Sequence, residues 1–254
     1  MTHLFPWGQA ARRERLTQSP WPPEWNSILA KTVHPWVLSV EQLAKWRQII
    51  RILVAEKGWQ GCDGFTVTDE VKVTIASQAA LLLLKMPHDY FARVRSIVVF
   101  PSEFDLPMND WQATPTIVLG VAPPEAVLLA WDRVLADGRD ASRGKNLVIH
   151  EFAHHLDLED GLWNGLPELR SKGQQVQWHE AMNAAFAELN HDLEKGYHTP
   201  LFDLHAATSL AEFFAAASER FFTVPLKLQR FFPKVCKVLE AYYGLRTADW
   251  FEER

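Results

Sequence analysis

Two histidines and a glutamate at residues 150–154 have the types and the spacing needed to hold a metal ion and activate water. The run reads His150-Glu151-Phe152-Ala153-His154, and if it is helical both imidazoles lie on one face, a single turn apart. Imidazole nitrogens at this spacing can bind one Zn²⁺ ion, which lowers the pKa of a bound water to about 7. Glu151 follows His150 directly, so its carboxylate can take the proton from that water. The pattern therefore indicates metal-assisted hydrolysis.

The apolar residues around this motif predict that its helix is buried. Leu147, Val148, Ile149, Phe152 and Leu156 give the segment a broad apolar surface. Buried polar side chains without partners are costly, and a bound cation removes that cost. The alternative is a partly exposed helix whose histidines and glutamate are solvated and bind nothing.

A catalytic zinc ion usually keeps three protein ligands, so a third ligand must come from elsewhere in the chain. One extension of the motif places Gly three residues after the second histidine and His three further on, but those positions are Asp157 and Asp160. The other arrangement takes an acidic residue from a later helix, and Glu212 lies in an almost entirely apolar stretch where a carboxylate is unusual. Ser209 and Glu212 also match a capping box, in which Glu212 would bond back to the Ser209 backbone. Spacing alone leaves both roles open.

Composition limits the classes of function. A net charge of −5 gives no broad basic surface, so nucleic-acid binding is not expected. Hydrophobic residues make up 48% of the chain, with 11 Trp and 15 Phe, which is ample for a large core. Cys62 and Cys236 are far apart in sequence, so reduced thiols are expected. The first residues lack a signal-peptide pattern and no apolar stretch approaches spanning length, so we expect a cytoplasmic protein without membrane association.

Pro, Gly and helix-capping residues mark the predicted ends of helices and strands along the chain. Residues 1–37 are rich in Pro and Trp and are predicted to form an arm that packs on the domain through its Trp side chains. Residues 38–254 are predicted to form a single domain. Predicted helices cover 39–57, 68–87, 142–157, 173–195, 207–222, a short stretch from 225, and 233–243; predicted strands cover 94–100, 116–121 and 127–131.

The order of helices, a small sheet and then helices predicts an α+β fold, mostly helical, with a small mixed sheet next to the motif helix. The strand at 127–131 directly precedes that helix. It could be the sheet edge along which an extended peptide binds by strand addition, or a plain buried strand.

Several segments beyond the motif resemble one family. They are PPEW at 22–25, GC at 61–62, TDEVKVTIA at 68–76, RSIVVFP at 95–101, HEFAH at 150–154, LD at 156–157, DG at 160–161 and AATSLAEFF at 206–214. Over roughly residues 20–240 the chain resembles the zinc-dependent peptidases of the Mlc titration factor A type, which are similar in catalytic domain to anthrax lethal factor. The resemblance implies a zincin-like fold.

The resemblance also implies roles for individual residues. His150, His154 and Glu212 would hold one zinc ion, and Glu151 would be the catalytic base. Asp157 lies one turn past His154 and would either hold a ligand histidine in its tautomer or be solvated at the helix end. The family carries a Tyr seven residues before the glutamate ligand, as the group that stabilises the oxyanion.

In this chain that position is His205. Either His205 takes over the oxyanion role, or activity is reduced, or Tyr197 reaches into the site. A histidine differs from a tyrosine because its charge varies near neutral pH.

Two functions from different classes follow. The first is a zinc peptidase, aminopeptidase-like on short peptides, with Glu151 as general base. The second is a regulatory protein that binds and sequesters a transcriptional repressor of sugar uptake, with hydrolysis secondary or absent. A purely structural zinc site is disfavoured because such sites are commonly closed by Cys. Glu151→Gln separates the first two, since binding alone survives it.

Overall fold

The computed structural model describes residues 6–86, 88–103, 125–197 and 201–251. Its helices are α1 (Pro6–Gln18), α2 (Pro23–Thr32), α3 (Val40–Glu56), α4 (Asp69–Leu81), α5 (Trp131–Arg139), α6 (Leu147–Asp157), α7 (Lys172–Glu194), α8 (Leu210–Thr223), α9 (Pro225–Phe231) and α10 (Pro233–Tyr243). Its strands are β1 (Gly58–Gly61), β2 (Ser96–Phe100) and β3 (Ala126–Ala130). The predicted α+β class with a dominance of helix is confirmed.

The sheet is small and its strands run in the order β1-β2-β3. Both pairings are parallel, with Gly58 opposite Ser96 and Ser96 opposite Ala126. The prediction of a mixed sheet is therefore wrong for the part of the chain that the structure describes. Helix α4 crosses between β1 and β2, and such a crossover returns the chain in the same direction. The predicted strand at 116–121 lies outside the described residues.

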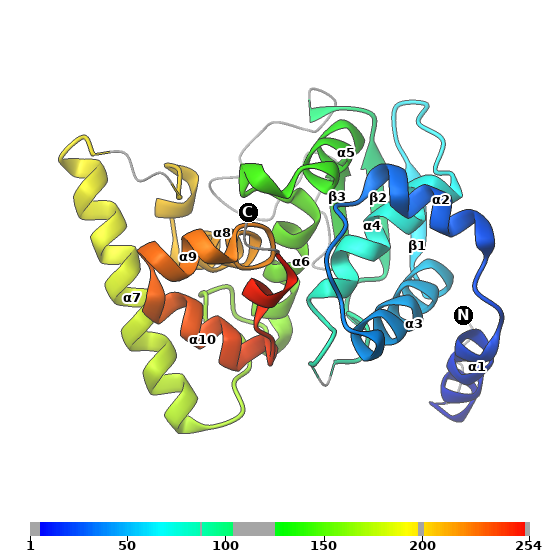
Figure 1. The fold of residues 1–254 in the computed structure, drawn as a ribbon, viewed down its shortest axis with the longest axis horizontal. Coiled ribbons are helices and arrows are strands. Elements are labelled where there is room, and N and C mark those ends of the chain that lie inside the picture. Colours follow the sequence, from blue (N-terminus) through cyan, green and yellow to red (C-terminus); the bar gives the residue numbers. More distant parts are fainter. Residues whose placement is uncertain (1–5, 87, 104–124, 198–200, 252–254) are drawn as a thin grey trace.

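Figure 1 shows α6 between two groups of elements, with the sheet and α2 to α4 on one side and α7, α9 and α10 on the other. Helix α4 is buried over nearly its whole length from Val71 to Leu81, because it contacts α2, α3, α5 and α6. Helix α3 begins with the predicted capping box, in which Ser39 and Gln42 exchange hydrogen bonds.

Helix α8 is the buried element of the second group. Its sequence is apolar almost all round, so it needs neighbours on every side. Helices α6, α7, α9 and α10 supply them, with aromatic contacts such as Trp178 to Phe214 at a centroid distance of 5.4 Å. This packing places α6 directly against α8.

The N-terminal arm consists of α1 and α2 in its described part. Trp25 is buried, and Arg13 of α1 pairs with Glu56 of α3 at 2.7 Å. Cys62 and Cys236 are free thiols, in agreement with the expectation from their spacing. Within the described ranges, none of the helices combines the length and the apolar character that crossing a membrane requires.

Candidate metal centre

The centre is built from one side of α6 and the first turns of α8. Helix α6 is capped by Asn146, whose side-chain oxygen accepts a hydrogen bond from the Ile149 amide at 2.9 Å. Helix α8 is capped by Ser209, whose hydroxyl accepts from the Glu212 amide at 3.1 Å. Only this half of the predicted capping box is formed, because the Glu212 side chain turns toward the histidines instead. The two caps thus fix where each helix starts and which side chains face each other.

Three of the predicted site residues converge. Glu212 Oε2 lies 3.1 Å from His150 Nε2, and Glu212 Oε1 lies 3.4 Å from His154 Nε2. The two Nε2 atoms of His150 and His154 are 3.1 Å apart. Because His150 and His154 share one face of α6 and Glu212 belongs to α8, the contact between these helices brings the three together.

These distances fit a small tetrahedral cation. Zinc–nitrogen bonds of about 2.0–2.1 Å place neighbouring ligand atoms of a tetrahedron about 3.3–3.4 Å apart. The three separations observed between His150, His154 and Glu212 are 3.1, 3.1 and 3.4 Å. Without a cation, one imidazole Nε2 must face another at hydrogen-bond distance beside a carboxylate. The residues present therefore suit a divalent metal ion such as zinc.

The charges at the centre also favour a bound metal ion. Burial disfavours a charged His150, but hydrogen bonds with Glu212 and Glu219 outweigh it and raise the His150 pKa to about 10. Burial also opposes a charged Glu212, yet hydrogen bonds from His150, His154 and His205 hold its pKa well below the usual range. The contact region between α6 and α8 thus contains ionised carboxylates and favours a positive charge.

Glu219 is a site residue that the sequence analysis missed. Its Oε1 lies 2.8 Å from His150 Nδ1, and its Oε2 accepts from the Asn146 amide at 2.7 Å. It also contacts Arg220 at 2.9 Å. A histidine that donates its Nδ1 proton presents Nε2 as the free ligand atom, so Glu219 fixes the tautomer and direction of His150. Glu219 follows Glu212 by two turns on the same face of an apolar helix, and this periodicity was the available signal.

Glu151 and His205 flank the three converging residues. The Glu151 pKa is raised by burial, which is partly opposed by the nearby histidines His150 and His154. His205 begins a 3₁₀ turn (His205–Ala207) before α8, and its Nε2 lies 2.9 Å from Glu212 Oε2. Its ring stacks on His150 with centroids 6.0 Å apart. Ligand atoms of His150, His205 and Glu212 all lie within 4.8 Å of one another, so His205 is close enough to contact a bound ion.

Tyr197 occupies a different place from His205. It follows the end of α7, its side chain is exposed, and its amide donates to the Asp192 carbonyl at 2.9 Å. The structure thus brings His205, and not Tyr197, to the Glu212 carboxylate.

Asp157 is buried at the end of α6. Its Oδ2 accepts from the amides of Asn164 at 3.0 Å and Gly165 at 2.9 Å, so it holds the loop after the helix. Its Oδ1 and the His154 Nδ1 atom are both buried without a hydrogen-bond partner in the described part of the chain. Whether Asp157 holds a ligand histidine remains a prediction.

Most of the sequence matches one family of known proteins. The model of the glucose-regulated metallo-peptidase M90 family matches residues 7–244. The chain belongs to this family. A metallopeptidase family implies a bound metal ion, and the converging side chains of His150, His154 and Glu212 are where the chain offers donors for one.

Individual relatives extend over most of the chain. An uncharacterised protein of Synechocystis sp. is 31% identical over 252 residues, covering 96% of this chain and 90% of its own length. Mlc titration factor A of Serratia proteamaculans is 28% identical, covering 88% and 91%. Mlc titration factor A of Yersinia pestis is 26% identical, covering 80% and 85%. The resemblance stated from the sequence is confirmed.

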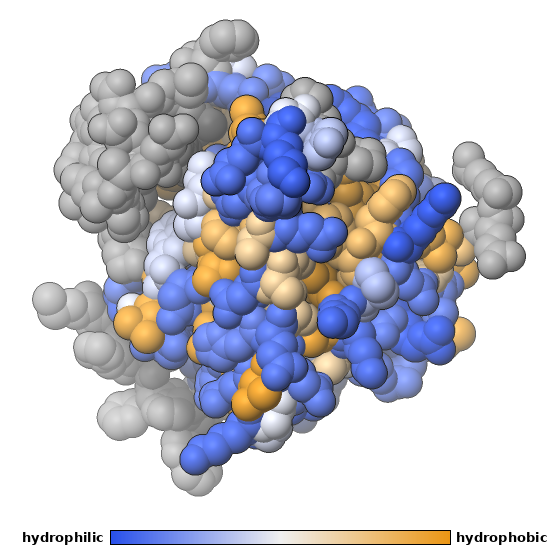
Figure 2. All heavy atoms as spheres, turned by 90° about the vertical axis from the view of Figure 1, so that its left-hand side faces the viewer, coloured by the Kyte–Doolittle hydropathy of each residue, from blue (hydrophilic) through white to orange (hydrophobic). Residues whose placement is uncertain are grey.

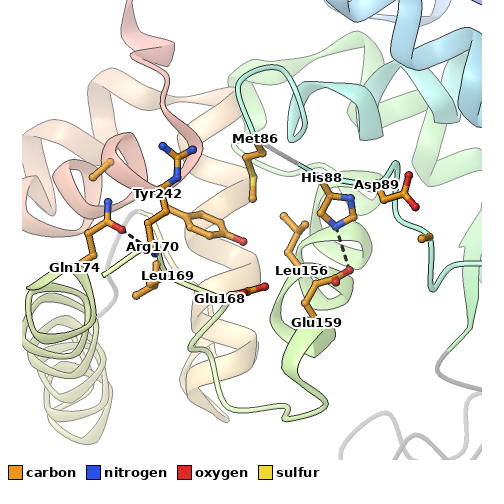
Figure 3. A pocket seen from close by; sticks show the side chains of 12 residues that line it. Met86, His88, Asp89, Leu156, Glu159, Glu168, Leu169, Arg170, Gln174 and Tyr242 are labelled. Atoms are coloured by element: carbon orange, nitrogen blue, oxygen red, sulfur yellow. Dashed lines mark hydrogen bonds and ion pairs between the residues drawn. The ribbon is translucent and has the colours of Figure 1, made fainter. Parts of the chain in front are cut away.

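A separate cavity of about 270 Å³ lies beyond the C-terminal end of α6. Leu156 and Glu159 form one wall; the others are formed by α10 and by Met86, His88, Asp89, Ala92, Glu168, Leu169, Arg170 and Gln174. Figure 3 shows His88 bonded to Glu159 on one side and the Tyr242 hydroxyl pointing into the cavity from the other. None of the converging metal-centre residues lines it, so it is distinct from the candidate metal centre.

Proposed function

We propose that this protein is a zinc-dependent peptidase in which His150, His154 and Glu212 hold one zinc ion. The observation that carries the proposal is the convergence of their three side chains at spacings of 3.1–3.4 Å, which match the edge of a zinc tetrahedron. Membership of a metallopeptidase family supports it.

In this mechanism Glu151 is the general base and acid. Zinc, when bound, supplies a Lewis acid that polarises the scissile carbonyl and makes water easier to deprotonate. Glu151 takes the proton from the attacking water and passes it to the leaving amine. Burial raises the Glu151 pKa, which brings its proton affinity closer to that needed for both transfers. The base is thus tuned by its surroundings as well as positioned by α6.

His205 is proposed to donate a hydrogen bond to the oxygen on which negative charge develops. Its Nε2 lies 2.9 Å from Glu212 Oε2, and its side chain is 47% exposed, so it is accessible to a substrate. A positioned donor of this kind stabilises the tetrahedral intermediate more than the substrate.

Asp157 is proposed to accept a hydrogen bond from His154. Ligand histidines usually donate their second ring proton to a carboxylate or carbonyl. Nδ1 of His154 and Oδ1 of Asp157 are both buried, and neither has a hydrogen-bond partner among the residues that the structure describes. Asp157 would then act on His154 as Glu219 acts on His150, while its other oxygen holds the loop.

The proposed substrate is a short peptide, cleaved in an aminopeptidase-like manner. An extended peptide would add along β3, the strand that precedes α5 and α6 in the chain. Strand addition would align the peptide backbone with the sheet next to α6.

The test measures zinc content and peptide hydrolysis of the wild type and of Glu151→Gln. The expected result is close to one zinc per chain in both, with hydrolysis only in the wild type. Glu180→Gln, an exposed change on α7, is the matched control and should behave as the wild type. Absence of zinc from the wild type after loading and dialysis would overturn the assignment of the ligands.

A second candidate is binding to a transcriptional repressor of sugar uptake, which the relatives named Mlc titration factor A favour. In Figure 2 the face on the α7 side is mainly hydrophilic, with hydrophobic side chains gathered near its middle. Leu226 and Phe231 of α9 are 46% and 48% exposed and would suit a protein contact. Glu151→Gln should bind a purified repressor as the wild type does, whereas Phe231→Asp should weaken binding and leave hydrolysis unchanged.

A further inference from the structure

The loop between α6 and α7 is fixed beside the candidate centre by contacts with three helices. Asp157 of α6 accepts hydrogen bonds from the Asn164 and Gly165 amides, and Trp178 of α7 donates to the Gly165 carbonyl at 2.8 Å. Gly165 has a φ of +74°, and a Cβ there would lie 2.4 Å from the Leu210 carbonyl oxygen of α8. The backbone of the loop therefore rests directly on α8, which leaves its tip little freedom to move.

These contacts hold the loop so that Trp163 lies against His154, one of the proposed metal ligands. The indole lies against the His154 ring, with centroids 4.7 Å apart and planes at 39°. Trp163 is nevertheless 44% exposed, and the adjacent Leu162 is 57% exposed. Part of the indole thus covers His154 while the rest faces solvent next to the centre. Leu204, next to His205 in the chain, is 71% exposed.

The exposure of Trp163 is unusual for its position. A tryptophan is large and mostly buried in folded proteins, and its exposed apolar area is unfavourable in water. The loop could place a small polar residue at its tip without loss of the Asp157 hydrogen bonds, since these use only backbone amides. The exposed part of the indole and the exposed Leu162 side chain next to it in the chain favour contact with apolar groups.

We propose that Trp163 is the binding surface for a large apolar side chain of the peptide substrate, on a residue next to the bond that is cleaved. The inference rests on the proposed peptidase function and names the substrate class of the same site: short peptides with Phe, Leu or a similar residue at that position. Contact with the exposed part of the indole buries apolar area from both partners, and aromatic side chains gain further from ring–ring contact.

The experiment compares kcat/KM for matched peptides that differ only by Phe or Ala at each position in turn. In the wild type one position should show a strong preference for Phe. Trp163→Ala should reduce that preference about 10- to 100-fold, and Trp163→Phe should restore most of it. Val176→Ala, which removes an exposed apolar side chain of α7, is the control and should leave the preference unchanged.

Measurements of zinc content and of peptide binding distinguish a failure of this proposal from a failure of the proposed peptidase function. Zinc should stay bound in the variants, and if Trp163→Ala loses it, Trp163→Leu provides the same comparison with His154 still covered. If the wild type cleaves none of the peptides, dissociation constants of the same peptides, measured by calorimetry on the zinc-loaded protein, replace kcat/KM. A preference for Phe over Ala that is absent, or that is unchanged when Trp163 is replaced, would overturn the proposal in either assay.

Discussion

Replacement of Glu219 by Gln tests whether the carboxylate behind His150 contributes to metal binding. The side chain keeps its size, so packing is preserved. Glu219 accepts from His150 Nδ1 with one oxygen and from the Asn146 amide with the other. A glutamine has one acceptor oxygen, so its NH₂ group must face either the Asn146 amide or the two donors, His150 Nδ1 and Arg220 Nη1, that share Glu219 Oε1.

The expected loss of zinc affinity follows from the missing acceptor oxygen. One hydrogen bond to a charged acceptor is worth about 1.5–3 kcal/mol, and its partner is left unsatisfied in a buried place. Outer partners of ligand histidines typically contribute 10- to 100-fold in metal affinity, which corresponds to about 1.4–2.7 kcal/mol. We therefore expect Glu219→Gln to bind zinc about 10- to 100-fold more weakly.

The assay is competition for zinc with a chromophoric chelator of known affinity. Glu188→Gln, an exposed change on α7, is the control with the same chemical substitution. Thermal melting of the metal-free proteins shows whether the variant is folded. A folded Glu219→Gln that binds zinc within about twofold of the wild type would refute the role assigned to Glu219, since the smallest expected effect is tenfold.

Three further changes test other features. His205→Ala should lower kcat by about 10²–10³-fold with zinc retained, as for loss of an oxyanion donor, and loss of zinc would instead make His205 a ligand. The pKa of buried Lys57 is lowered by burial from its usual 10.5 to about 8, so the unfolded chain binds more protons between these values. Relative to Lys57→Met, the wild type should therefore gain up to about 3 kcal/mol of stability in chemical denaturation between pH 8 and 10.5, and a constant difference between the two proteins would contradict this. In Gly138→Ala a Cβ would lie 2.7 Å from both Gln78 Nε2 and the Thr32 carbonyl oxygen. A loss of about 1–3 kcal/mol in chemical denaturation is expected, and an unchanged midpoint would contradict it.

The elements that the sequence predicted well carry local signals. The capping box at Ser39 marks the start of α3, and Gly244, with a φ of +67°, ends α10 as expected. The helices that the sequence analysis missed have weak or misleading local sequence signals. Helix α2 has Pro23 at its first position, where proline is favourable, yet its Pro-rich surroundings indicated irregular structure. Helix α5 starts from Ala130 without a side-chain cap.

The residues of the candidate centre also differ in how well local sequence signals predict them. His150 and His154 belong together because one turn of helix separates them, which is visible in the sequence. The pairing of Glu212 with them depends on contact between two helices far apart in the chain, so only the resemblance favoured it over the capping role. Glu219 contacts a residue 69 positions away, and its two-turn spacing from Glu212 does not by itself distinguish a metal-site residue from a buried structural carboxylate.

The direct contact between α6 and α8 has a consequence for engineering. His150 and His154 come from α6, Glu212 and Glu219 from α8, and the hydrogen bond from Asn146 to Glu219 joins the two helices. The arrangement is therefore nearly self-contained in a pair of short helices. To transplant it into another scaffold, a designer would need to reproduce one interhelical crossing and two helix starts. The new scaffold would also have to supply the apolar neighbours that α7, α9 and α10 provide for α8.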